Sequence, residues 1–214
     1  MARELARTIK SFSPSMQQGV DAEDYELIVV DNGSARSPQE RELKALAPNL
    51  VLISQPAATV SPVPAIHRRL EVARGDLIGV CIDGARMASP GLIAKALTAS
   101  RLHERPAIGT PAFHPGTDLQ RASVLQGYSQ EVEDALLTDC RWEDDGYRLF
   151  DISSLAGSSV YAWFVIPAET SALFLRRTHC ATSAAALTCA SGAPAGGWRT
   201  LTCGDDWPPI RRSR

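Results

Sequence analysis

The sequence predicts an α/β fold with a mostly parallel sheet and helices on both of its faces. Short apolar runs alternate with capped helical segments through the first half of the 214 residues, as in chains that build a parallel sheet. Each run is continuously apolar, which is typical of strands buried on both faces. Two of the runs end in an acid with a glycine close behind it, at Asp31 and Asp83. Open parallel sheets bind ligands at the carboxyl ends of their strands, so both acids are candidate site residues.

Each element of the first half has its own local signal. The apolar spacing of Leu5, Ile9 and Phe12 indicates the first helix. Ser37 and Ser89 each precede a proline and a helical segment, which predicts that each caps a helix. We therefore expect helices over residues 4–12, 37–46, 64–75 and 89–102, and strands over residues 25–31, 49–54, 76–83 and 106–113.

The second half has a looser pattern. Residues 130–139 predict a helix, and residues 172–177 predict a last strand. Between them, residues 142–153 and 157–166 indicate irregular or antiparallel elements. Residues 178–214 have few large apolar side chains and no sustained period, so we expect an irregular or disordered tail. The predicted domain therefore covers residues 1–177.

Composition excludes several classes of function. The net charge of −2 offers no basic surface to nucleic acid or anionic lipid. No apolar run approaches the ~20 residues that span a bilayer, and no signal-peptide pattern is visible at the N-terminus. The five cysteines are odd in number and form no CxxC pair. These features predict a reduced, cytoplasmic protein with no transmembrane segment, no disulfide framework and no zinc site.

The acids at the strand ends allow a functional and a structural interpretation. A carboxylate there can accept hydrogen bonds from a ribose or base, or help to hold a divalent cation beside a diphosphate. Gly33 and Gly84 would let the backbone approach such a ligand. Asp, Asn and Gly are also common turn residues, so one such motif alone means little.

Two stretches resemble segments of family-two glycosyltransferases with the GT-A fold. They are "YELIVVDNGS" (residues 25–34) and "AIHRRLEVARGDLIGVCIDGARMASPGLI" (residues 65–93), in the order and spacing of that family. The "DGARM" variant resembles a subgroup found among polysaccharide-related transferases, and the resemblance covers roughly residues 4–177. It implies a GT-A-like, Rossmann-like sheet and inverting transfer of a sugar from a nucleotide-sugar donor to a saccharide acceptor.

The resemblance also implies roles for individual residues. Asp31 would contact the uracil or ribose of the donor, in a loop that continues with Asn32, Gly33 and Ser34. Asp83 would be the first acid of a DxD-like motif, near the ribose and the metal-bound diphosphate, with Gly84 behind it.

The chain departs from the family pattern at this motif. Ala85 replaces the second acid, which is usually a metal ligand, so the resemblance leaves open whether Mg²⁺ or Mn²⁺ binds at Asp83. Arg86 would supply positive charge near the diphosphate, although an exposed arginine explains it equally well. His67 stands where many relatives have asparagine, and we interpret it as a helix-surface residue.

Two family segments have no counterpart in this sequence. The family has a strand before its first helix, whereas this chain opens in that helix, so we expect an incomplete sheet. The family's catalytic base lies in a segment resembling "GGFDxRF" followed by "NLD". Plausible codons for residues 183–191 and 198–203, read one nucleotide earlier, can encode both pieces, which predicts a frameshift between Arg177 and Ser183. Glu169, just before the last strand, is a weak catalytic candidate.

Three functions remain as alternatives. The first is a glycosyltransferase-like enzyme, and the second is a non-catalytic remnant of one, truncated and frameshifted. The third and weakest is a nucleotidyltransferase, whose usual Gly-rich basic loop after the first strand is not visible here. GxGxxG, P-loop and GxSxG motifs are not found, so dinucleotide, ATP-cradling and serine-hydrolase functions have no support.

Overall fold

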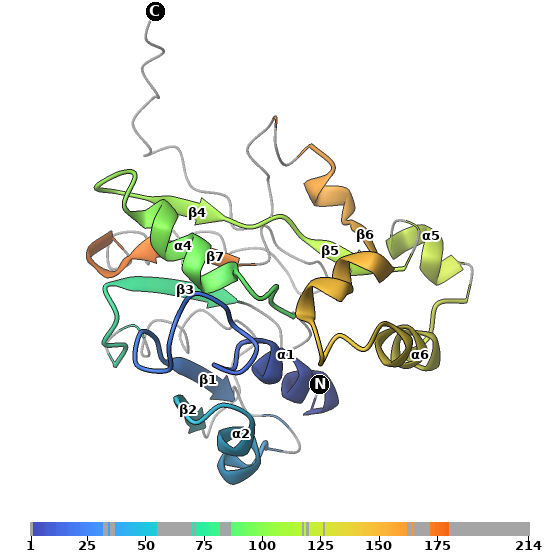
Figure 1. The fold of residues 1–214 in the computed structure, drawn as a ribbon, viewed down its shortest axis with the longest axis horizontal. Helices are drawn as coiled ribbons and strands as arrows, with labels where there is room; N and C mark the ends of the chain where they lie inside the picture. The colour runs from blue at the N-terminus through green and yellow to red at the C-terminus, as the bar shows by residue number, and fades with distance from the viewer. Residues whose placement is uncertain are drawn as a thin grey trace, which may run out of the picture.

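The structure is a computed structural model, and it describes residues 2–31, 34, 37–54, 70, 72–81, 87–116, 118, 120–125, 127–161, 164 and 172–179. Figure 1 shows helices and small sheets in alternation. The helices are α1 (Ala2–Ser11), α2 (Glu40–Leu46), α4 (Leu92–Ser100), α5 (Gln120–Leu125), α6 (Gln130–Cys140) and the 3-10 helices η1 (Gly146–Ile152) and η2 (Gly157–Ser159). The strands are β1 (Leu27–Asp31), β2 (Leu50–Ser54), β3 (Leu77–Cys81), β4 (Ala107–Gly109), β5 (Phe113–Pro115), β6 (Ser153–Leu155) and β7 (Ala172–Arg176).

The strands form three small sheets. β1 and β2 pair in parallel, with Leu27 opposite Leu50 and Asp31 opposite Ser54. β7 lies between β3 and β4 and is antiparallel to both, and β5 and β6 form an antiparallel pair. The α/β class is therefore confirmed. The described pairing is mixed rather than mostly parallel, because β7 returns antiparallel through the middle of its sheet.

Most expected elements occur near their predicted positions. The helices over residues 4–12 and 130–139 and the strands over residues 25–31, 49–54 and 172–177 are confirmed to within a few residues. The fourth strand is shorter than expected, because Pro106 and Pro111 bracket β4 and cannot donate to a ladder. Residues 142–166 supply the 3-10 turns and the antiparallel strand β6, as their pattern indicated. Most of the helix expected over residues 64–75 lies outside the described residues.

The cap predicted for the second helix is wrong. α2 begins at Glu40, and its N-cap position is Gln39, whose side chain makes no capping hydrogen bond. Ser37 lies outside the helix, and its hydroxyl hydrogen-bonds the carboxylate of Asp31 instead. A serine hydroxyl binds whichever acceptor or donor the fold brings near, and here that partner is the acid at the end of β1.

The cap predicted for the fourth helix is also wrong. Gly91, not Ser89, occupies the N-cap position of α4. The side-chain oxygen of Gln17, from the segment after α1, accepts the hydrogen bond of the Ile93 backbone N–H at 3.3 Å. The distant Gln17 thus does what a local capping side chain usually does.

Buried apolar residues fall into three clusters. The first joins α1 and α2 to β1 and β2 around Ile9, Leu43 and Leu50. The second lies between α4 and the β3–β7–β4 sheet around Phe174. The third joins α6 to η1 around Trp142. The β1–β2 sheet, the β3–β7–β4 sheet and the α6–η1 pair therefore each have their own apolar cluster.

A buried polar residue connects these units. Gln17 is 5% exposed, and its amide nitrogen donates to the carbonyls of Ser11 at 2.8 Å and Ser89 at 3.0 Å. The hydroxyl of Ser11 accepts the backbone N–H of Ala88 at 2.8 Å. With the bond to Ile93, these contacts tie the end of α1 to the beginning of α4.

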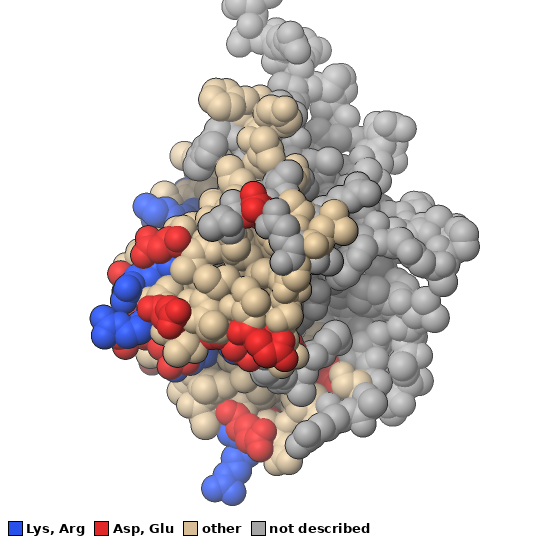
Figure 2. All heavy atoms as spheres, turned by 90° about the vertical axis from the view of Figure 1, so that its right-hand side faces the viewer, with Lys and Arg blue, Asp and Glu red and all other residues tan. Residues whose placement is uncertain are grey.

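Surface properties agree with the balanced composition. Figure 2 shows the side of the molecule that carries α5 and α6, where acidic and basic side chains are mixed at the left edge, a basic side chain projects at the bottom, and acidic patches interrupt a largely uncharged surface. Among the helices of the described residues, none is long and apolar enough to cross a membrane.

Candidate functional site

Among the predicted site residues, Asp31 is the one whose surroundings the structure describes in most detail. It ends β1 and faces Ser54, the last residue of the parallel strand β2. The residue is only 5% exposed, although a carboxylate usually stays in water unless it is paired. Its Oδ1 accepts the backbone N–H of Ser34 at 2.9 Å, so the carboxylate is bonded to the chain three residues further on.

The surroundings of Asp31 favour its charged form. Burial raises the pKa of the carboxyl, but hydrogen bonds from the side chain and backbone of Ser34 and from the hydroxyl of Ser37 together outweigh burial. The net effect is a pKa below the usual range for aspartate. The strand end therefore holds a fixed, ionised acceptor that could receive hydrogen bonds from a ligand hydroxyl or N–H.

The remaining residues of the predicted site lie outside the described residues. They are Asn32, Gly33, Asp83, Gly84, Arg86 and the catalytic candidate Glu169, together with Ala85. β3 brings the chain to Cys81, two residues before Asp83. A shared site of Asp31 and Asp83 therefore stays a prediction.

An ion pair connects the segments that precede β1 and β3, the two strands that lead to these acids. Nε of Arg74, just before β3, lies 3.1 Å from Oε2 of Glu26, just before β1, and the Arg74 backbone N–H donates to the other carboxylate oxygen at 2.7 Å. The amino ends of β1 and β3 are thus neighbours, and both strands run left to right in Figure 1. Yet the two strands belong to different sheets, with no hydrogen-bonded ladder joining them among the described residues.

The described residues contain no group of three His, Cys, Asp or Glu side chains that could hold a metal ion. Asp83, the predicted metal ligand, lies outside the described residues, so this finding does not extend to it. Cation binding by this motif stays a prediction.

A hollow of about 250 Å³ lies elsewhere, where the start of η1 meets the segment after α1. The sequence predicts no site at "WEDDGY" (residues 142–147), which borders this hollow. The motif itself was the available signal, because it combines Trp142, which is buried, with a tyrosine and three acids. The lining residues are Ser15, Met16, Gln18, Pro90, Glu143, Asp144, Asp145, Gly146 and Tyr147.

A second group of titratable side chains joins β5 to α6. The ring of His114 lies against that of Tyr128 with centroids 5.0 Å apart, and the Tyr128 hydroxyl donates to Oε2 of Glu133 at 3.2 Å. Nε2 of His114 is buried without a hydrogen-bond partner. Burial lowers the pKa of His114, and the charge of Glu133 offsets part of that effect. Burial, with the charge and hydrogen bond of Glu133, raises the pKa of Tyr128.

No protein-family model matches the chain, and no curated protein matches it either. The functional interpretation therefore depends on the motifs quoted above and on the geometry of the described residues.

Proposed function

We propose that this protein is a glycosyltransferase-like domain that binds a nucleotide-sugar donor at the carboxyl ends of β1 and β3. The observation that carries the proposal is Asp31: a buried carboxylate at the end of a parallel strand, oriented by its own loop and favoured in its ionised form. Such an acceptor suits the hydroxyls of a ribose or the N–H of a uracil. The resemblance of residues 25–34 and 65–93 to the family supplies the ligand class.

The neighbouring ends of β1 and β3 support the same site. The Glu26–Arg74 contact holds the starts of both strands together, and both are five residues long. The chain that follows β3 contains the "DGARM" motif. In this proposal Asp83 contacts the ribose or the diphosphate, and Arg86 compensates phosphate charge where the second acid of the family motif is replaced by Ala85.

Calorimetry with uridine diphosphate tests the proposal directly. The nucleotide should bind weakly, Asp83→Ala should abolish binding, and Asp31→Ala should weaken it. Asp76→Ala is the matched control, because Asp76 lies just before the amino end of β3 and is exposed. Nucleotide binding that survives both Asp31→Ala and Asp83→Ala would remove both acids from the site. Manganese should increase affinity less than in an enzyme with a complete DxD motif.

One structural observation favours the second candidate, a non-catalytic remnant. Among the described residues, no hydrogen-bonded ladder joins the β1–β2 sheet to the β3–β7–β4 sheet. A central sheet that lacks one strand would be divided in this way. Inverting transfer also needs a base positioned at the acceptor hydroxyl, and the sequence offers no in-frame equivalent of the family's base segment. We expect negligible release of nucleotide diphosphate by this chain, measured against a version restored to the alternative frame after Arg177. Equal, robust turnover by the unmodified chain would exclude the remnant.

A further inference from the structure

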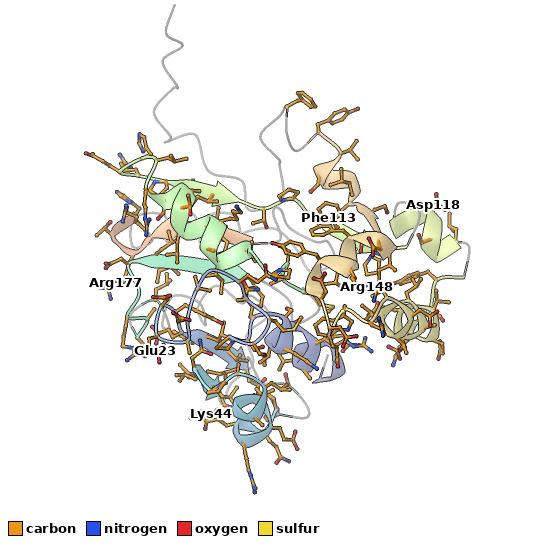
Figure 3. All side chains as sticks on the ribbon, in the orientation of Figure 1. Glu23, Lys44, Phe113, Asp118, Arg148 and Arg177 are labelled. Carbon is orange, nitrogen blue, oxygen red and sulfur yellow. The ribbon has the colours of Figure 1, made fainter. Side chains whose placement is uncertain are left out.

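Three aromatic side chains form an exposed row on η1 and β5. The rings of Tyr147 and Phe150 stack with centroids 6.4 Å apart and planes 24° apart, and the edge contact of Phe150 with Phe113 spans 4.9 Å. Their exposed fractions are 43%, 42% and 39%. Figure 3 labels Phe113 on β5 and, next to it, Arg148 on η1. A contiguous exposed apolar surface of this kind marks an interaction site more often than single exposed residues do.

The row continues into the hollow after α1. Tyr147 belongs to both, since its side chain stacks on Phe150 and lines the cavity of about 250 Å³. Its position is fixed by close packing: a Cβ added at Gly91 would lie 2.8 Å from the Tyr147 hydroxyl, and one added at Gly146 would lie 2.9 Å from Cγ of Pro90. The aromatic row therefore adjoins a polar hollow whose acidic residues are exposed to solvent.

Three carboxylates in the hollow are oriented by bonds within the protein. Glu143 pairs with Lys10 at 2.7 Å, Asp144 approaches Arg141 at 3.5 Å, and Asp145 accepts the Tyr147 backbone N–H at 2.9 Å. Each of these bonds uses one oxygen. Within the described part of the chain, the second oxygen of each carboxylate has no bonded partner, so each retains acceptor capacity toward the hollow.

We infer that the aromatic row and the adjoining hollow form a binding surface for a neutral saccharide chain. A sugar ring presents an apolar face of C–H groups, which can lie on Tyr147 or Phe150, and a rim of hydroxyls, which donate to carboxylates such as Glu143 and Asp145. The inference rests on the proposed function in one respect, because it gives the expected saccharide acceptor a place on the molecule. The surface uses other elements than the strand ends that carry Asp31.

Charge and hydrogen-bond chemistry disfavour two other ligands that bind aromatic surfaces, single-stranded nucleic acid and proline-rich peptides. Single-stranded nucleic acid stacks on aromatic rings but needs a basic groove for its phosphates, whereas this hollow is acidic. Proline-rich peptides also dock on aromatic grooves, but they present carbonyl acceptors and few N–H donors. The carboxylates of this hollow can only accept, so they match a ligand rich in hydroxyl donors.

The test is saturation-transfer NMR followed by calorimetry on the full chain. The probes are neutral tetrasaccharides of glucose, galactose and N-acetylglucosamine, an acidic tetrasaccharide of galacturonic acid, and a proline-rich decapeptide. At least one neutral probe should bind in the low-millimolar range or tighter. Tyr147→Ala and Phe150→Ala should each weaken that binding by about fivefold to tenfold, the effect of losing one aromatic contact.

Two further variants separate recognition from folding. Gly91→Ala retains every aromatic ring but moves the Tyr147 hydroxyl, so it should weaken the neutral probe while Phe150 remains in place. Tyr161→Ala is the control, because Tyr161 is 69% exposed and lies outside the row, and it should bind as the unmodified chain does.

Several outcomes would overturn the inference. They are failure of every neutral probe, binding of the acidic probe or the peptide alone, and neutral binding that persists in the double variant Tyr147→Ala/Phe150→Ala. Nucleotide binding distinguishes this failure from failure of the proposed function. Uridine diphosphate should bind equally well to the aromatic variants, and Asp31→Ala should leave saccharide binding unchanged.

Discussion

The ring of Phe174 lies directly over Gly79. The two residues are opposite one another in the antiparallel β3–β7 ladder, and a Cβ added at Gly79 would come within 2.5 Å of a ring carbon. Phe174 is 7% exposed and belongs to the apolar cluster beneath α4. The absence of a side chain on Gly79 is what allows the ring to occupy this place, so the glycine contributes to the core through its partner.

Substitution of Gly79 should therefore destabilise the fold. Gly79→Ala should lower the free energy of unfolding by about 1–3 kcal/mol, the usual cost of overpacking. Gly157→Ala is the matched control, because a Cβ there meets no atom within 4 Å and should have little effect. Combining Gly79→Ala with Phe174→Leu should recover part of the loss. Urea denaturation measures these proteins and the single variant Phe174→Leu, and additive losses in the double variant would contradict the packing explanation.

Adjacent glutamines should differ sharply in their contribution to stability. Gln17→Ala removes the bonds of the Gln17 amide to the Ser11 carbonyl, the Ser89 carbonyl and the Ile93 N–H, of which the Ser89 carbonyl keeps the Leu92 N–H, and should cost about 2–3 kcal/mol. Gln18 is exposed, so Gln18→Ala should change stability by less than about 0.5 kcal/mol. Thermal and urea unfolding should both show this order. Equal effects would mean that the Gln17 bonds do not support the fold.

Asp31 should stabilise the protein in its ionised form. Its folded-state pKa lies below the usual value, so its contribution is complete above the unfolded-state pKa of about 3.9 and is lost as pH falls through the folded-state pKa. Asp31→Asn should therefore reduce stability at neutral pH and flatten the acid limb of the stability profile. Urea unfolding between neutral pH and pH 3 measures both effects. An unchanged acid limb would show that the hydrogen bonds from Ser34 and Ser37 do not favour the carboxylate.

His114 should also make stability fall as pH drops, but in a higher pH range and because its charged form is disfavoured by burial. Burial lowers its folded-state pKa, so the unfolded chain takes up the proton first, and stability should fall as pH drops below about 6.5. His114→Gln should remove this part of the pH dependence. Glu133→Gln should lower the pKa of His114 further and extend the loss of stability to lower pH. A profile that is flat between pH 7 and pH 5 in the unmodified chain would contradict the prediction.

The elements that sequence reasoning placed correctly are those with strong local signals. The short apolar runs of β1, β2 and β7 favour a strand, and the helical apolar period of α6 favours a helix. Each segment therefore indicates one type of secondary structure. The direction of strand pairing has no such local signal, because it depends on which strand lies between two others in the sheet. Nothing in "ALFLRR" shows that β7 lies between β3 and β4 and runs against both.

The capping errors have a common physical origin. Sequence rules assign a cap to the nearest serine, whereas the fold supplies partners from distant segments. Ser37 binds Asp31 instead of capping α2, and Gln17 caps α4 from 76 residues away. Both partners are side chains brought together by tertiary structure, which local patterns do not encode.

The candidate site was predictable only in part. Asp31 was identified from the end of an apolar run, and the structure places it there. The aromatic row was not foreseen, because Phe113 and Phe150 meet only through the pairing of β5 with β6 and the turn of η1. A surface built from separated segments leaves no motif in the sequence.

The division of the apolar interior into three clusters sets how the molecule should open in solution. Apolar clusters that share few side chains can unfold separately, each with its own free energy of opening. Backbone amides of β1 and β2 should then exchange with deuterium through one opening event, and those of β3 and β7 through another. The bonds of Gln17 join the end of α1 to α4, so they are one of the links through which one opening event reaches the next. Cooperative unfolding in this protein thus depends on buried polar contacts such as the Gln17 amide as well as on its apolar cores.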